Sequence, residues 1–499
     1  MVMSVPLRPL SSGLAATDGS VAIMLALASH MIKHTYWSKD IIFLFTQHEF
    51  VGVQAWLDGY FEVQTSSYVK AERLPARAGL IQAAINLELS GMSFGGIDVL
   101  IEGINGLLPN LDLVNLVHKL ARENGIRSTI HHRPDLFSKD LDKLVPHNIL
   151  TTFTMMANLA TGMPSGNHGL FLRFRVDSLT IKSAPGGSSG LNSVGQLVEG
   201  VFRSINNLLE KFHQSFFFYL MPCTYRYISI GLYIPPFALM VAASLIQAIM
   251  LWSRFTFEVD TKKSKLIANQ DQAFTSDGKF TDDTIHTLRL PDNVVQGVYS
   301  LIPLIVGCHL SGLMLLKAPS LFGGGEVKQM PAADTVILGG LAGIVSSMML
   351  IRTVLRKEEF DGINWYLFKT ISLIYHGLTL FLLSLLNISL AAIVAAFTVP
   401  VYTVIRPTSY KLLTGLQMLL LLLISPVSII LICQTLYNVV TGNAQIHSLE
   451  FFSLLTDLQH SVLYAIIDHL VYKNYLLNIV CLVLYPTWLM FWSLLFMNV

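Results

Sequence analysis

Long apolar runs fill the second half of the chain, whereas the first half alternates short apolar runs with amphipathic segments. A helix that crosses a bilayer needs about 20 mostly apolar residues. We identify runs of this kind at about 229–252, 293–316, 333–355, 365–386, 388–405, 410–438 and 474–497. The sequence therefore predicts a membrane domain with about seven transmembrane helices over residues 215–499.

Residues 1–214 predict an α/β domain. Strand-length apolar runs lie between amphipathic segments, which is typical of a mainly parallel sheet covered on both faces. The runs are Ile41–Thr46, Gly79–Leu89 and Ile97–Glu102, and the helical patterns are Val21–His34, Phe50–Leu57, Leu111–Asn124 and about Ser193–Phe212.

The opening residues suggest that a longer natural N-terminus precedes this domain. Residues 1–10 have no apolar core of a signal peptide. We expect no strand before the first helix, so the sheet would lack its opening strands.

Composition agrees with a membrane protein. Charged residues make up 13% of the chain and hydrophobic residues 53%, against about 25% charged in soluble domains. This excludes an ordinary soluble enzyme and a disordered chain, and a net charge of +1 argues against a nucleic-acid binder. The four cysteines are too few for a disulfide scaffold.

Lysine and arginine residues indicate the orientation of the membrane domain. They cluster after the first, third and fifth runs, and cytosolic loops carry such an excess. The bias places the front domain on the non-cytosolic side and the C-terminus in the cytosol. The sequon at Asn387 falls in a very short loop, so we expect no glycan there.

Candidate metal ligands are sparse. His30 and His34 have the spacing of two ligands on one helix face, but no third ligand follows, so polar ends of a helix explain them better. Asp18, Gln47–Glu49 (including His48) and Glu88 fall at a helix start and at two strand ends, where α/β folds gather ligands. These are too few for a two-zinc hydrolase, and capping and surface roles are favoured.

The junction between the two domains carries a more specific pattern. His213, Gln214 and Ser215 stand directly before the aromatic cluster Phe216–Tyr219. Aromatic residues sit at headgroup level, where these polar side chains could contact phosphate or sugar, and the Gln214 oxygen could reach a divalent ion. An interfacial anchor with polar ends is the alternative interpretation.

Several ordered stretches resemble the GPI-anchor attachment subunit of GPI transamidase, the Gaa-type family. The resemblance runs from about residue 15 to the end of the chain, over both halves. It rests on residues 36–41, 81–89, 102–113, 168–173, 213–219 and 484–489 (YWSKDI, IQAAINLEL, EGINGLLPNLDL, HGLFLR, HQSFFFY and LYPTWL).

The resemblance implies a multi-pass protein of the endoplasmic reticulum membrane, with a luminal front domain similar to a zinc aminopeptidase fold. Within that similarity Asp18, Gln47 and Glu88 fall near metal-ligand positions. Gln47 stands where a ligand Glu is expected, with Thr46 at the place of the general base. The terminal ligand His has no match after Ser178–Lys182, and the first ligand would lie upstream of residue 1. This implies a peptidase fold without its metal site.

The resemblance also implies partners and a lipid. The partners would be a cysteine-protease-like catalytic subunit, other membrane subunits and, through the complex, the proprotein substrate. His213, Gln214 and Ser215 are similar to a GPI-headgroup contact, with Gln214 near a divalent ion (magnesium or calcium), and Pro486 resembles a proline linked to GPI recognition. A helix proline frees a carbonyl and bends the helix, which could open a groove for acyl chains.

The sequence thus favours a non-catalytic subunit that binds the GPI lipid and presents it for attachment to proproteins. We expect no tightly bound cofactor, and a nucleophilic cysteine must come from a partner. Two alternatives remain at this point: a membrane metallopeptidase that acts through Asp18 and Glu88, and a pure assembly scaffold without lipid contact.

Overall fold

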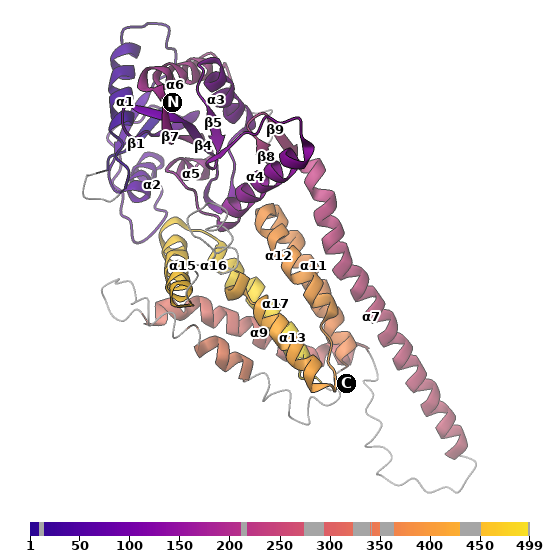
Figure 1. Ribbon diagram of the computed structural model, residues 1–499. Helices are drawn as coiled ribbons and strands as arrows, with labels where there is room; N and C mark the ends of the chain where they lie inside the picture. Colours follow the sequence, from indigo (N-terminus) through magenta and orange to yellow (C-terminus); the bar gives the residue numbers. More distant parts are fainter. Residues whose placement is uncertain are drawn as a thin grey trace. The chain divides into compact units, whose positions relative to one another are not determined.

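The computed structural model (Figure 1) describes residues 1–8, 14–210, 217–273, 294–322, 340, 342–349, 364–429 and 451–497. These residues form two compact units. The first comprises Met1–Pro235, Leu386–Leu390 and Ile467–Leu476, and the second comprises Pro236–Leu385, Ala391–Ile466 and Leu477–Val499. An α/β front domain followed by a helical membrane domain is therefore confirmed.

A mixed seven-stranded sheet forms the centre of the first unit, in the order β2-β1-β3-β7-β4-β5-β6. The strands β2, β1, β3 and β7 run parallel, β4 is antiparallel to β7, and β5 is parallel to β4. The strands are β1 (Val2–Pro6), β2 (Ile42–Thr46), β3 (Ala83–Glu88), β4 (Ser93–Leu100), β5 (Ser128–Ile130), β6 (Arg133–Pro134) and β7 (Asp177–Gly190).

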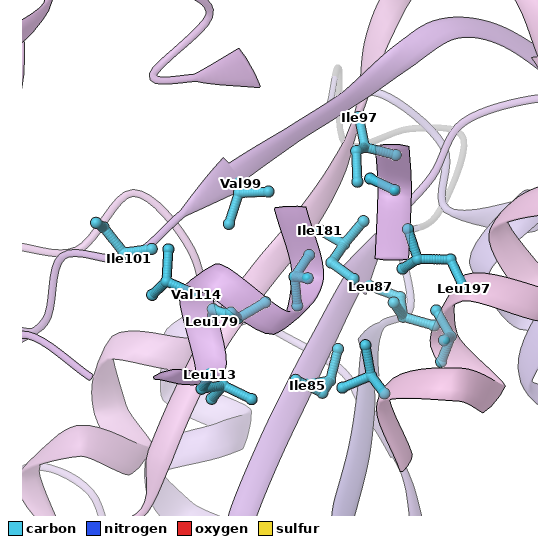
Figure 2. Close-up of a cluster of buried hydrophobic side chains, with 14 of the residues drawn as sticks. Ile85, Leu87, Ile97, Val99, Ile101, Leu113, Val114, Leu179, Ile181 and Leu197 are labelled. Carbon is cyan, nitrogen blue, oxygen red and sulfur yellow. The ribbon is translucent and has the colours of Figure 1, made fainter. Parts of the chain in front are cut away.

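Helices cover both faces of this sheet. One face packs against α1, α3 and α6, where strand residues such as Ile85 and Leu87 meet Leu113 and Leu197 (Figure 2). On the other face, α2 and α5 provide apolar side chains such as Leu57 and Phe171. The helices are α1 (Asp18–Met31), α2 (Glu49–Phe61), α3 (Leu111–Glu123), α4 (Leu141–Thr161), α5 (His168–Arg173) and α6 (Leu191–Asn206).

The expectation that no strand precedes the first helix is wrong. Val2–Pro6 forms β1, which pairs with β2 on one side and β3 on the other. The strand has only five residues and contains the polar Ser4, so the apolar pattern does not predict it. The Ser4 hydroxyl is satisfied in the interior because it donates to Asn86 Oδ1 at 3.0 Å, so a polar residue can occupy a central strand.

A β-hairpin connects the first unit to the membrane helices. It consists of β8 (Tyr219–Cys223) and β9 (Arg226–Ser229), which pair antiparallel. The long helix α7 (Ile230–Ala273) begins directly after β9, and its residues Ile230–Thr261 are long and apolar enough to cross a membrane.

Two short segments from the second half of the chain belong to the first unit. Asn387 stands between α11 (Trp365–Leu386) and α12 (Ile388–Val404), and its amide donates to the Leu159 carbonyl at 2.6 Å. Asn474 follows α15 (Phe451–Tyr472) and donates to the Thr161 carbonyl at 3.1 Å. These turns are therefore part of the same compact unit as the front domain.

The described part of the second unit is helical. Four helices meet the length and hydropathy of a membrane span: Ile230–Thr261, Gly297–Lys317, Trp365–Leu386 and Leu476–Leu494. The shorter apolar helices α12 and α13 (Lys411–Leu423) match the fifth expected run and part of the sixth. Most of the third expected run, 333–355, lies outside the described residues, so the expected total of about seven stays a prediction.

The last membrane helix makes a close contact with α9 (Val294–Phe322). A π-helical turn, Val480–Leu484, precedes α17 (Tyr485–Leu494). A Cβ added at Gly312 of α9 would lie 2.1 Å from the Cys481 carbonyl oxygen and 3.0 Å from Pro486 Cγ. Small residues allow membrane helices to approach this closely, so Gly312 is required by the packing.

We expect Gly312→Ala to lower the free energy of unfolding by about 1–3 kcal/mol, because the added methyl group forces the two helices apart. Thermal unfolding of the full chain in detergent measures this. Gly307→Ala is the matched control, since a Cβ at this position of the same helix meets nothing within 4 Å. Equal unfolding temperatures for the two variants would contradict the packing argument.

Candidate functional site at the carboxyl edge of the sheet

The carboxyl ends of three parallel strands meet at one edge of the sheet. Arg8 follows β1, Gln47 and Glu49 follow β2, and Glu88 ends β3. Ligands in α/β folds bind at this edge, which makes it the first place to look for chemistry.

A largely buried arginine links these strand ends. Arg8 Nε lies 2.6 Å from Glu49 Oε1, and Arg8 Nη2 lies 2.8 Å from Glu88 Oε2. The arginine side chain is 11% exposed and that of Glu88 is 4% exposed. Burial by itself would lower the pKa of Arg8, but hydrogen bonds and charges from Glu49 and Glu88 outweigh burial and raise the pKa above its ordinary value.

The turn from β2 to α2 places Glu49 in this ion pair. His48 and Glu49 both adopt left-handed backbone angles, with φ of 62° and 49°, which non-glycine residues rarely do. Gly52 allows the tight turn, since a Cβ there would lie 1.9 Å from the Gln47 carbonyl oxygen. Such backbone strain persists only where the surrounding contacts hold it, and the Arg8 pair is one of these contacts.

A hydrogen-bonded network lies behind Glu88. Asn86 Nδ2 donates to Glu88 Oε1 at 3.1 Å and to Thr180 Oγ1 at 3.0 Å. Ser4 Oγ donates to Asn86 Oδ1, so the network crosses from β1 through β3 to β7. Both carboxylate oxygens of Glu88 are therefore engaged by the protein's own donors.

The three residues that were predicted near metal-ligand positions are not joined by hydrogen bonds. Glu88 bonds to Arg8, as described above. Asp18 lies exposed at the start of α1, where its Oδ1 accepts from the Gly91 N–H at 3.2 Å. Gln47 is exposed after β2.

The donor set at this edge does not fit the two-zinc site of an aminopeptidase. Such a site needs several carboxylates and histidines that converge on the metals. Here a guanidinium, which carries positive charge itself and has no lone pair to give, is bonded to the buried carboxylate. Within the described part of the chain, no group of three His, Cys, Asp or Glu side chains could hold a metal ion.

His30 and His34 lie at and just beyond the end of α1. Their ring centroids are 4.5 Å apart, and the His34 ring stacks on Tyr36 with a centroid distance of 5.2 Å. Both histidines are exposed. Together with Tyr36 they form an aromatic cluster on the surface.

A second buried polar cluster escaped the sequence analysis. The Glu102 side chain accepts from the Ser165 N–H at 3.2 Å and from the Ser165 hydroxyl. His131 Nε2 lies 3.5 Å from the same carboxyl group. His168 bonds to Thr180 Oγ1 at 2.8 Å, and burial lowers its pKa to about 4, which keeps the ring neutral at neutral pH. These residues share no motif spacing, although Glu102 and His168 each open a stretch on which the family resemblance rests.

The predicted membrane-junction site can be placed only in part. His213, Gln214 and Ser215 lie outside the described residues. The next residues are described: Phe218 is 59% exposed, whereas Tyr219 is buried and its hydroxyl donates to the Pro109 carbonyl at 3.0 Å. Pro486 is buried near the start of α17, and its ring faces Gly312 of α9.

Arg8 is the residue at this edge that the sequence analysis missed. Its partners Glu49 and Glu88 are 41 and 80 residues away. The sequence signal that could have identified Arg8 is its position two residues after β1. The sequence analysis did not predict β1, so it did not use this signal.

We expect Arg8→Met to destabilise the first unit by about 3–5 kcal/mol, because it leaves the Glu88 carboxylate buried without its partner. The unfolding temperature of the full chain in detergent reports the change. Adding Glu88→Gln to Arg8→Met should restore part of the loss, since the buried charge is then removed and only Glu49, whose side chain is 29% exposed, stays without its partner.

Arg77→Met is the matched control for this prediction. Arg77 pairs with Glu62 at the surface, where both side chains are more than a third exposed, and such pairs contribute about 0–1 kcal/mol. A loss at Arg8 no larger than the loss at Arg77 would show that the buried pair is not important for stability.

Comparisons with known proteins agree with the sequence analysis. Residues 1–492 match the family described as "Gaa1-like, GPI transamidase component". The chain is 32% identical over 226 residues to the "GPI transamidase component GAA1" of Saccharomyces cerevisiae, which covers 44% of this chain and 34% of the yeast protein. It is 31% identical over 247 residues to "GPI transamidase component gaa1" of Schizosaccharomyces pombe, which covers 49% of this chain and 42% of that protein. The matched segments thus span less than half of the length of these two relatives. The family match, in contrast, extends over nearly the whole chain. The chain therefore belongs to the Gaa1-like family of GPI transamidase components.

Proposed function

We propose that the chain is a non-catalytic subunit of GPI transamidase in the endoplasmic reticulum membrane, which binds the GPI lipid and presents it for attachment to proproteins. Its family membership supports a role in GPI-anchor attachment. The front domain would face the lumen and the C-terminus the cytosol, which agrees with the Lys and Arg bias of the loops.

The ion pair of Arg8 with Glu88 carries the non-catalytic part of this proposal. A peptidase-like fold would hold its metals at the carboxyl edge of the sheet. At this edge the protein supplies an arginine cation, and both oxygens of the buried carboxylate are bonded to protein donors. A metal would have to displace a charge-assisted pair before it could bind, and such pairs are among the stronger hydrogen bonds.

The partners would supply the covalent chemistry. The cysteine thiolate of a protease-like subunit would attack the peptide carbonyl before the C-terminal signal, so that a thioester forms as the C–N bond breaks and the signal peptide leaves as the amine. The amine of the lipid's phosphoethanolamine would then attack the thioester carbonyl, so that an amide bond forms, the C–S bond breaks and the thiol leaves. The role of this chain would be to hold the amine in place, which is a positioning contribution.

Lipid binding is assigned to the junction and to the last membrane helix. His213, Gln214 and Ser215 offer hydrogen bonds to phosphate and sugar oxygens, and Gln214 could share a magnesium or calcium ion with a phosphate. The chain enters its first membrane helix at Ile230, so these residues precede the bilayer by a short hairpin. Pro486, beside the π turn of the last span, would shape the region of the acyl chains.

Replacing residues 213–215 by alanine should reduce GPI binding by about one to several orders of magnitude. Each lost hydrogen bond is worth roughly 0.5–1.5 kcal/mol, or about 1.5–3 kcal/mol where the partner is charged, and about 1.4 kcal/mol is tenfold. The measurement is the amount of GPI that co-purifies with the full chain, together with recovery of the other subunits.

The double variant Asn192→Ala and Gln196→Ala is the control for this experiment, because both side chains are exposed on α6 of the same domain. Normal lipid recovery with the triple variant would show that residues 213–215 act only as an interfacial anchor. Loss of subunits together with lipid would make its role structural and would favour an assembly scaffold.

A second experiment addresses catalysis. We expect the purified full chain to bind no stoichiometric zinc and to hydrolyse no aminoacyl amide in the presence of added zinc. Gln47→Glu should not create activity, because a two-metal site needs its other ligands as well. Metal analysis and amide hydrolysis provide the measurements, and zinc-dependent hydrolysis by the unchanged chain would support the metallopeptidase alternative.

A further inference from the structure

A line of apolar side chains on α4 points away from the core of the first unit. Leu141, Val145, Ile149 and Phe153 are 67%, 49%, 63% and 39% exposed. They are spaced four residues apart, so they lie next to each other along one face of the helix. Soluble proteins rarely leave a continuous apolar surface in water, and such a surface usually marks a contact.

Aromatic side chains extend this surface beyond the start of α4. Phe137 is 80% exposed and stacks on Tyr225 of the β8–β9 turn, with ring centroids 5.7 Å apart. The Arg226 guanidinium lies 5.9 Å from the Tyr225 ring centroid. The turn is held there because the Thr224 N–H donates to Asp135 at 2.9 Å.

Three connections tie α4 to places where the chain enters membrane helices. The hairpin that leads into α7 packs along α4, where the Met221 N–H contacts Met155 Sδ at 3.2 Å (Figure 1). At the other end of α4, Asn387 donates to the Leu159 carbonyl and Asn474 to the Thr161 carbonyl. Asn387 lies between α11 and α12, and Asn474 lies two residues before the last span.

These connections hold the ends of apolar helices beside α4 within the first unit. The helix has 21 residues, which gives it a length of about 30 Å. One part is held by a hairpin that continues directly into a membrane helix, and its end is held by turns of other apolar helices. A helix fixed at such points cannot stand far from the membrane, so its exposed apolar side chains have a bilayer within reach.

We propose that α4 and the β8–β9 turn form a membrane-contact surface, in which Leu141, Val145, Ile149 and Phe153 enter the boundary between headgroups and acyl chains. Helices with one apolar face bind bilayers in this way. Tyr225 and Phe137 suit the headgroup level, and Arg226 can reach lipid phosphates while its stem stays in apolar surroundings. The surface holds the front domain at a fixed height and orientation over the lipid.

Spin labels on the full chain test this contact. A nitroxide is attached to Ile149→Cys, and the chain is placed in nanodiscs of phosphatidylcholine and phosphatidylinositol. Oxygen partitions into lipid and a nickel chelate stays in water, so the ratio of the two collision rates reports depth. We expect a ratio several times higher at Ile149→Cys than at Lys143→Cys.

Lys143→Cys is the matched control because Lys143 lies on the same helix and its side chain is 75% exposed. It follows Leu141 by two residues, which turns it by about 200° from Leu141. Of the four cysteines, Cys223, Cys308 and Cys481 are buried and Cys433 lies outside the described residues, so the unsubstituted chain, labelled in the same way, gives the background signal.

Each other outcome overturns the proposal. Equal nickel access at the two positions would show that the apolar face stays in water. A label at Ile149→Cys that becomes shielded only after the other transamidase subunits are added would show that a protein covers this face. Val145→Cys gives a second reading in case the substitution at Ile149 disturbs the fold.

Discussion

Hydrogen bonds from asparagine side chains hold turns of the membrane helices inside the α/β unit, and the integrity of that unit depends on them. Asn387 and Asn474 donate to carbonyls at the end of α4, and the Tyr475 N–H donates to Asn105 Oδ1 at 2.7 Å. The unit is therefore completed by residues that follow it by more than 150 positions. A fragment that ends after the hairpin would lack these partners and would leave carbonyl groups of α4 without them.

Charge compensation at the carboxyl edge of the sheet is the second constraint. A buried carboxylate needs a partner, and in peptidase-like folds that partner would be a metal. Arg8 provides the positive charge within the chain itself, and its bond to Glu49 also fixes the strained turn after β2. The same arrangement therefore stabilises the edge and occupies the carboxylate oxygen of Glu88 that faces Arg8.

The sequence predicted those parts of the fold in which local pattern and tertiary packing agree. Ile41–Thr46 and Leu111–Asn124 are close to the observed β2 and α3, because their apolar residues face the core. The pattern failed for β1, whose Ser4 is satisfied only by the distant Asn86. It also failed for α4, whose exposed apolar residues do not face the core. The edge of the sheet was predicted as the location of a site, but the Arg8 pair depends on contacts between residues far apart in the chain.

The position of Asn387 has a consequence for how the chain matures. The atom to which a glycan would be attached, Nδ2, is the atom that donates to the Leu159 carbonyl. Even a methyl group on Gly106 would come within 2.4 Å of it, so there is no room for a sugar. In a compartment where sequons are glycosylated, docking of this turn and modification of Asn387 exclude each other. A chain that carried a sugar at Asn387 could not make the hydrogen bond from Nδ2 to Leu159.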